Sequence, residues 1–181
     1  LSALGGDLAI NNTVTATAGN ASLLASGNVT QAAAGDVTVG GTLDVNAQGG
    51  NITMTDGAVS SSTGSGNIRY LATGDISLAS LSTGGDVRVD AGGNIIDNGD
   101  TDVDVIANNA QLVAGGSVGE PQGTNNGLID TTVTTLAASA GTGGVYVDNS
   151  TALTLGNVAA INVNRIDTAG AATVQAGSAL A

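Results

Sequence analysis

The chain of 181 residues contains no cysteine, histidine, lysine, phenylalanine or tryptophan. Without cysteine and histidine, the sequence excludes zinc fingers, haem ligation, iron–sulfur clusters and catalysis by a cysteine nucleophile. The lack of histidine also removes the side chain that most often carries protons near neutral pH. Together with the candidate residues discussed below, this composition leads us to expect a protein that is not an enzyme.

Positive charge is also scarce. Arg69, Arg88 and Arg165 are the only cationic side chains, and the formal net charge is -12. This balance repels phosphate groups, so we expect neither nucleic acid nor anionic membranes as partners. No apolar run approaches the roughly 18 residues of a membrane helix, and no basic, signal-like segment opens the chain. We therefore interpret the sequence as part of a longer polypeptide that does not itself insert into a membrane.

What the sequence contains instead is a short repeated pattern of glycine, Asp or Asn, an aliphatic residue, any residue, and usually a second aliphatic residue. Clear copies occupy residues 6–10, 35–39, 50–54, 66–70, 74–78 and 85–89, and looser ones begin at residues 27, 93 and 156. Side chains two positions apart lie on one face of a strand, so Val37 and Val39 point together. The pattern predicts short strands, separated by corners at which glycine reaches positive φ and Asp or Asn bonds to nearby amides.

Grouping three strands per unit gives units that start at Asp7, Asn28, Asn51 and Asp75, which are nearly evenly spaced. Repeats of this length stack as solenoids, because one unit is too small to bury its own apolar face. We therefore predict an all-β parallel β-helix of roughly eight coils with about 21–24 residues each. Its narrow interior explains the missing large aromatics, whereas the alternatives, a β-sandwich or a barrel, usually use them.

We expect one continuous β-helix over residues 1–181. Residues 116–127 contain the only proline, Pro121, and predict a protruding loop between coils. Alternation returns after this loop at residues 145–147, 153–155, 161–163 and 173–176, and we assign these runs to further coils.

The chained Gly-Asp and Gly-Asn strands, with the stretch from Leu136 to Asn149, resemble giant repetitive bacterial surface proteins related to filamentous haemagglutinin. The resemblance covers nearly the whole chain and is one of repeat style and composition. It implies a right-handed parallel β-helix, secretion to the cell surface and a role in adhesion or cell–cell contact. The family carries no catalytic residues to transfer.

Asp100, Asp102 and Asp104 form the sharpest candidate site. On a strand, the three carboxylates would share one face while Val103 and Val105 enter the core, and clustered oxygen ligands suit Ca²⁺. However, position twelve counted from Asp100 is Gln111 and not Glu, so the run does not match an EF-hand. A solvated acidic face explains the run more simply than calcium does, and we expect no other cofactor.

Three further patterns each have a simpler structural explanation. Asp36, Asp75 and Asp86 are compatible with a β-helical polysaccharide hydrolase or lyase, but a role as corner residues that bond the backbone explains them more simply. Repeated Thr-x-Thr, as in residues 13–17, suits ice binding, but its irregular spacing favours ordinary β-propensity. Arg69 and Arg88 should point outward and pair with Asp on adjacent coils, contributing about 0–1 kcal/mol.

The expected function is therefore structural or adhesive: a rod in a large exported protein that mediates or extends contact with other cells through surface glycans or proteins. The alternative is a carbohydrate-active β-helical enzyme or a polysaccharide-binding module. Because neither 1–6 nor 177–181 looks like a capping segment, we also expect end-to-end self-association of the chain.

Overall fold

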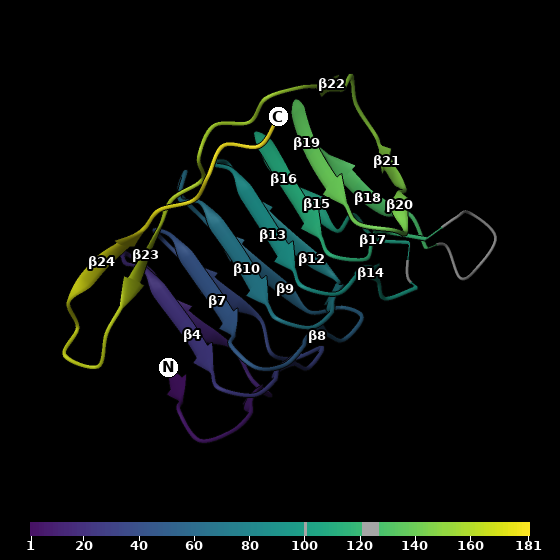
Figure 1. Ribbon diagram of the computed structural model, residues 1–181. Helices are drawn as coiled ribbons and strands as arrows, with labels where there is room; N and C mark the ends of the chain where they lie inside the picture. The colour runs from purple at the N-terminus through teal and green to yellow at the C-terminus, as the bar shows by residue number, and fades with distance from the viewer. Residues whose placement is uncertain (100, 121–126) are drawn as a thin grey trace.

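The computed structural model describes residues 1–99, 101–120 and 127–181, and this part of the chain is entirely β-structure and connections, with no helix. Three parallel sheets, here named A, B and C, wrap around one core as a β-solenoid (Figure 1). Each turn of the chain adds one strand to sheet A, then one to B, then one to C. The predicted all-β parallel solenoid is confirmed.

The strands of each sheet follow one another in order along the rod. Sheet A contains β1 (Ser2–Ala3), β4 (Ala21–Ala25), β7 (Leu43–Ala47), β10 (Ile68–Ala72), β13 (Val87–Ala91), β16 (Asn109–Ala114), β19 (Thr135–Ala140) and β22 (Thr154–Leu155). Sheet B contains β2 (Leu8–Ile10), β5 (Val29–Gln31), β8 (Ile52–Met54), β11 (Ile76–Leu78), β14 (Ile95–Asp97), β17 (Ser117–Val118) and β20 (Gly144–Val145). Sheet C contains β3 (Val14–Ala16), β6 (Val37–Val39), β9 (Val59–Ser62), β12 (Ser80–Thr83), β15 (Val105–Ile106), β18 (Ile129–Thr132) and β21 (Val147–Asn149).

The coils are fewer and less uniform than the repeat predicts. Paired Cα positions in sheet A run through Ser2, Leu24, Asn46, Leu71, Asp90, Val113 and Ser139, a path of about six turns. The shortest turn leads from Leu71 to Asp90 and the longest from Val113 to Ser139. The predicted number of coils is too high, because the last part of the chain leaves the solenoid.

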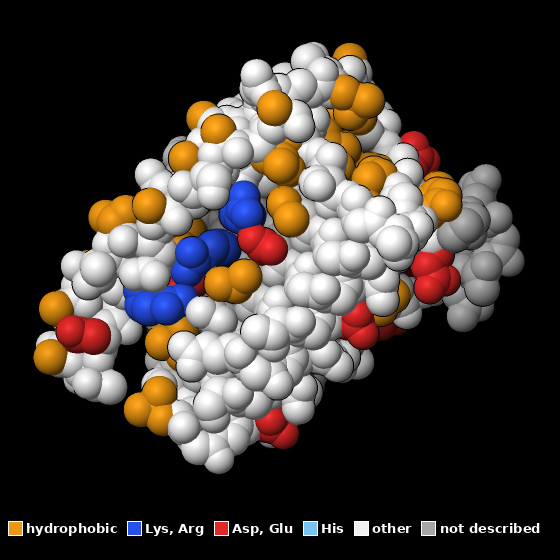
Figure 2. Space-filling view, in the orientation of Figure 1, with side chains coloured by type: hydrophobic (Ala, Val, Ile, Leu, Met, Phe, Trp, Pro, Cys, Tyr) orange, Lys and Arg blue, Asp and Glu red, His pale blue; other side chains and the backbone are white. Residues whose placement is uncertain are grey.

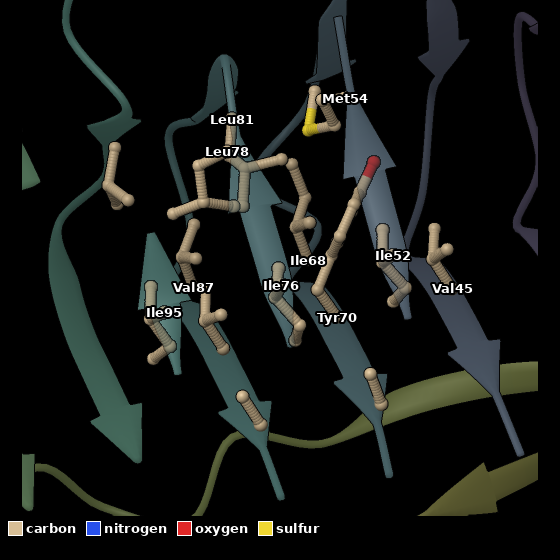
Figure 3. Packing of buried hydrophobic residues seen from close by; sticks show 14 of the residues in the cluster. Val45, Ile52, Met54, Ile68, Tyr70, Ile76, Leu78, Leu81, Val87 and Ile95 are labelled. Carbon is tan, nitrogen blue, oxygen red and sulfur yellow. The ribbon is translucent and has the colours of Figure 1, made fainter. Parts of the chain in front are cut away.

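The core consists of aliphatic columns that run along the rod. In sheet B, Val29, Ile52, Ile76, Ile95 and Val118 are paired in register and all are buried. Figure 3 shows these isoleucines pointing into the interior together with Val45, Ile68 and Val87 of sheet A. The narrow space admits one large aromatic side chain, that of Tyr70, whose exposed fraction is 1 %.

Polar groups from sheets B and C satisfy the hydroxyl of Tyr70, a sheet A residue, inside this core. Tyr70 on β10 donates to Ser60 Oγ on β9 at 2.7 Å, and its oxygen lies 3.2 Å from Gln31 Oε1 on β5. Gln31 Nε2 in turn donates to the carbonyl of Val59 at 3.1 Å. Burial raises the pKa of the Tyr70 phenol far above its ordinary value near 10, and the hydrogen bond with Ser60 opposes this only in part.

The Asp and Asn residues that follow the corner glycines bind the next coil. At the corner between sheets A and B, the side-chain Oδ1 of each such residue accepts the backbone N–H of its counterpart one coil later. The donor–acceptor distances are 2.7–2.9 Å for the successive pairs Asp7–Asn28, Asn28–Asn51, Asn51–Asp75, Asp75–Asn94 and Asn94–Ser117. The sequence predicts bonds to nearby amides, and the structure shows that the amides belong to the following coil.

This ladder, and not positive φ, explains the glycines that precede it. Gly27, Gly50, Gly74, Gly93 and Gly116 all have negative or extended φ. At each of them an added Cβ would collide with the Oδ1 atom of the preceding coil's Asp or Asn. The repeated Gly-Asp and Gly-Asn pairs therefore record a contact between coils, and the prediction of positive φ at these corners is wrong.

Residues 156–181 do not form further coils. After β22 this segment, here called the C-terminal strap, turns back and runs along the outside of sheet A toward the N-terminal end (Figure 1). The strap is an antiparallel hairpin, with β23 (Val163–Ile166) paired to β24 (Ala172–Gln175) and a further bridge between Val158 and Leu180. The runs 161–163 and 173–176, which alternation predicts to be coil strands, belong to this hairpin instead.

Half of the loop expected at residues 116–127 lies outside the described residues, which omit 121–126. Its first part is not a loop: Ser117 and Val118 form β17 and pair with β14 and β20 in sheet B. The run 145–147 contributes to β20 and β21, and 153–155 to β22, as predicted for coil strands.

Candidate functional site

The most distinctive polar surface of the molecule is a row of side chains on the outer face of sheet A, beneath the C-terminal strap. Alternation along the strands points these side chains away from the core, while their neighbours point into it. The paired positions of this row, here called the outer row, are Ser22, Asp44, Arg69, Arg88, Gln111 and Ala137. Outward residues of a sheet are ordinarily solvated, but here all except Arg88 are buried because the strap covers them.

Asp44 is the centre of this row. Its side chain has no exposed surface, and Oδ1 accepts from Arg69 Nη2 at 2.8 Å and from Arg69 Nε at 3.0 Å. Its other oxygen, Oδ2, accepts from Nε of Arg165, a strap residue, at 2.7 Å. Two guanidinium groups thus balance one buried carboxylate, and one of them joins the strap to the solenoid.

Arg88 and Gln111 extend the contact toward the other end of the strap. Arg88 donates to Asp90 Oδ2 at 2.6 Å and to Gln111 Oε1 at 2.5 Å. Gln111, which is fully buried, directs Nε2 at the carbonyl oxygens of Val158, Ala159 and Ser178, each at 3.0 Å. As a result, all three arginines of the chain gather in one patch on this face, as the blue side chains of Figure 2 show.

A groove of about 540 Å³ opens where the tip of the strap overhangs the first coils. Leu1, Leu4 and Leu24 form its solenoid side, and Ile166 and Thr173 belong to its strap side. The lining also includes Ser2, Arg165, Asp167, Thr168 and Gln175. Its surface is mostly apolar.

The acidic run does not have the strand geometry on which the calcium hypothesis depends. Residues 101–104 precede β15 and belong to no strand, Asp102 is exposed, and Asp104 is fully buried, so these two carboxylates do not share a face. Asp104 Oδ2 accepts the backbone N–H of Asp130 on the next coil at 2.8 Å. Asp100 lies outside the described residues, and within those residues no three acidic side chains gather as a metal site.

The three aspartates considered for glycoside chemistry stand at different corners. Asp36 precedes β6 of sheet C, Asp75 precedes β11 of sheet B, and Asp86 precedes β13 of sheet A. Each Oδ1 accepts an amide of the following coil, from Val59 at 3.0 Å, Asn94 at 2.7 Å and Asn109 at 3.1 Å respectively. The structure therefore brings no two of them together as an acid–base pair.

Of the two arginine predictions, one is confirmed and one is modified. Arg69 pairs with Asp44 on the adjacent coil, as expected, but the pair is buried and not solvated. Arg88 pairs with Asp90 two residues along its own strand instead of with an adjacent coil. The sequence does not indicate that residues 156–181 fold back over sheet A. It does show that Arg165 is a rare cation in an acidic chain and that Asp44 faces outward on its strand.

The threonine pattern forms single columns on sheets B and C. Thr30, Thr53 and Ser77 are paired in register on the outside of sheet B. On sheet C, Thr15, Thr38, Ser61 and Ser82 are likewise paired, and Ile106 interrupts the column before Thr132. These two faces present small hydroxyl side chains at the spacing of the coils, about 4.8 Å.

Comparison of the chain with protein-family models, with curated proteins and with solved structures finds no match. The described residues include no helix with the length and apolar composition needed to cross a bilayer.

Proposed function

We propose that this chain is a structural and adhesive segment of a large exported bacterial surface protein, secreted or held at the cell surface. In this role the β-solenoid is a rod that mediates or extends contact with other cells through their glycans or proteins. The repeat style of the sequence, which resembles haemagglutinin-like surface proteins, supports this proposal alongside the fold.

The observation that carries the proposal is the use of the corner carboxylates and amides. Along one corner, side chains from Asp7 to Asn94 bind coil to coil without interruption, and Asp36 and Asp86 do the same at the other corners. The polar groups that a β-helical enzyme would place in a cleft are thus engaged in maintaining the rod. This favours a mechanical role over a catalytic one.

The contact faces in this proposal are those of sheets B and C, because the strap occupies the face of sheet A. Thr30 and Thr53 are exposed on sheet B, and Thr15 is exposed on sheet C. Hydroxyl groups both donate and accept hydrogen bonds, and short side chains leave these faces free of steric obstacles. Such faces suit extended polar partners such as surface glycans.

Binding of the fluorescently labelled chain to intact cells tests the proposal. We expect saturable binding that is reduced by Thr30→Glu and Thr53→Glu together, which add charge to the sheet B face. The matched control is Thr168→Glu, an exposed threonine of the strap. Equal loss with the control would show that charge alone lowers binding, and an absence of binding to every cell type would contradict the adhesive role.

The reading frame that encodes this sequence is a second test. We expect a long frame that includes further repeats and a secretion domain. A compact frame that ends near residue 181 would overturn the proposed surface role, as would polysaccharide turnover lost on changing Asp36, Asp75 or Asp86 to Asn.

A further inference from the structure

The outer row of sheet A and two residues that precede its strands, Thr42 and Asn67, contact the C-terminal strap mainly through backbone atoms of the strap. Gln111 Nε2 lies 3.0 Å from three of the strap's carbonyl oxygens, which share the two N–H groups of the amide, and Asn67 Nδ2 donates to the carbonyl of Asn162 at 2.9 Å. In the opposite direction, the backbone N–H groups of Asn164 and Ile166 donate to Thr42 Oγ1 at 2.9 Å and Ser22 Oγ at 2.8 Å. A surface of this kind binds an extended polypeptide with little dependence on its side chains.

One side-chain contact adds specificity to this recognition. Arg165 reaches the buried Asp44 at 2.7 Å, and a charge-assisted hydrogen bond of this kind is stronger than those between neutral groups. An occupant of the outer row therefore needs an extended hairpin with an arginine at this position. In this sequence, residues 156–181 meet that requirement.

The strap is also separable from the solenoid. Its apolar contacts form a small cluster of Val158, Ile161 and Leu180 with Ala137, distinct from the main core. When the strap is released and Arg165 leaves, Asp44 keeps both hydrogen bonds from Arg69. Release of the strap therefore leaves no buried charge without a partner. The connection through residues 151–157 is exposed throughout. It includes the two-residue strand β22, which pairs with β19, and its backbone N–H groups at Thr154 and Gly156 donate to the carbonyls of Thr134 and Leu136.

We propose that the outer row of sheet A is a binding surface for the C-terminal strap of a second copy of this chain. The strap closes on its own solenoid in one arrangement and crosses to a neighbouring copy in the other, with the same contacts in both. Because the exchanged straps are identical and the connection is exposed, two copies are linked by the same contacts that hold the strap within one copy. This inference concerns self-association and holds whether or not the proposed surface role is correct.

The absence of cysteine makes the exchange directly testable, because every introduced thiol is unique. An isotopically labelled Thr42→Cys chain is mixed with an unlabelled Asn164→Cys chain, both otherwise full length, at high concentration. A short bismaleimide is then added, and mass spectrometry identifies the cross-linked peptides. The Thr42→Cys/Asn164→Cys double variant reports the contact within one chain, and Thr38→Cys, on the outside of sheet C, replaces Thr42→Cys as the matched control.

We expect a cross-link between labelled residue 42 and unlabelled residue 164 that increases with protein concentration and is absent from the Thr38 control. Adding Arg165→Ala to the Asn164→Cys chain should lower its yield about tenfold, since the contact to Asp44 is lost. The proposal would be overturned if the double variant cross-links efficiently but the mixture of Thr42→Cys and Asn164→Cys chains gives no more cross-link between copies than the Thr38→Cys control. Failure of the double variant to cross-link would overturn it as well, because the strap would then not lie on this face. Simple end-to-end stacking would produce association without a 42–164 cross-link.

Discussion

At the corner between sheets A and B, each glycine from Gly27 to Gly116 that precedes the ladder makes room for a side chain that belongs to the preceding coil. Gly74 is the tightest case: an added Cβ would overlap Asn51 Oδ1, which accepts the N–H of Asp75 at 2.9 Å. Periodicity locates these corners in the sequence, since the units starting at Asp7, Asn28, Asn51 and Asp75 do occupy one corner. Periodicity does not explain why these residues are glycine, because the atom that excludes a side chain lies a whole coil earlier in the chain.

We expect Gly74→Ala to lower the free energy of unfolding by about 1–3 kcal/mol, because either the alanine or the Asn51 amide must move. The control Gly19→Ala lies in open space without positive φ, and it should change stability by no more than about 1 kcal/mol, toward greater stability. Urea unfolding measures both. In an Asn51→Ala background the Gly74→Ala penalty should shrink, and additive effects of the two changes would contradict the contact.

The Tyr70 hydroxyl is the second group whose role emerges only in three dimensions. Tyr70→Phe should lower the free energy of unfolding by about 0.5–1.5 kcal/mol, since Ser60 and Gln31 keep each other as partners at 3.2 Å. The same change at Tyr146, which lies outside the core, should have a smaller effect. Chemical denaturation of both variants distinguishes them, and equal effects would argue against the buried network.

The raised pKa of Tyr70 also predicts alkaline behaviour. The folded state holds this phenol's proton more tightly than the unfolded state does, so its contribution to stability is complete below about pH 10 and declines as pH rises above that value. In a Tyr146→Phe background, absorbance near 295 nm reports Tyr70 alone. We expect phenolate to appear together with loss of β-structure by circular dichroism, and ionisation in the intact fold would show that the side chain is accessible.

Among the elements, the C-terminal strap departs most from what the sequence predicts. The alternation of Ile161 and Val163 is the same as that of a coil strand, and period-two alternation states which side chains share a face but not which strand lies beside them. The strands Leu8–Ile10 and Val37–Val39 are predicted correctly because their partners repeat at regular steps. The strap has no such repeat, so its hairpin and its contact with Asp44 could not be derived from the pattern.

Removing each side of the Asp44 cluster should affect different elements. Arg165→Ala removes only the strap's contact, so hydrogen exchange of the amides in 163–166 should accelerate while β7 and β10 keep their protection. Asp44→Ala leaves Arg69, whose side chain is 9 % exposed, without a carboxylate, and should lower the free energy of unfolding by about 3 kcal/mol. Uniform acceleration throughout sheet A in Arg165→Ala would show that strap and solenoid unfold as one unit.

For the whole molecule, the two ends of the rod differ from its sides. Leu1 and Leu4 are 66 % and 74 % exposed at one end, and Leu155 is 75 % exposed at the other. Within the described residues, the strands at each end of sheets A, B and C pair with a neighbour on one side only, whereas the net charge of -12 separates molecules laterally. These features support the expectation that copies stack end to end.

Light scattering as a function of protein concentration tests this stacking. We expect larger particles at high salt, where repulsion is screened, and their loss in Leu155→Asp. The matched control is Ile106→Asp, which adds the same charge on the outside of sheet C, where Ile106 is 40 % exposed. A particle that stays monomeric in both buffers at high concentration would rule out end-to-end association.

The direction of the corner bonds has a consequence for how such a rod can change its length over evolutionary time. Each coil offers Oδ1 acceptors to the coil that follows and a glycine gap to the coil that precedes it. A duplicated coil would find both neighbours already matched, and a deleted coil would leave two surfaces that still fit. At this corner, gene segments that encode one turn are therefore interchangeable, and the number of copies can be altered without a new corner contact.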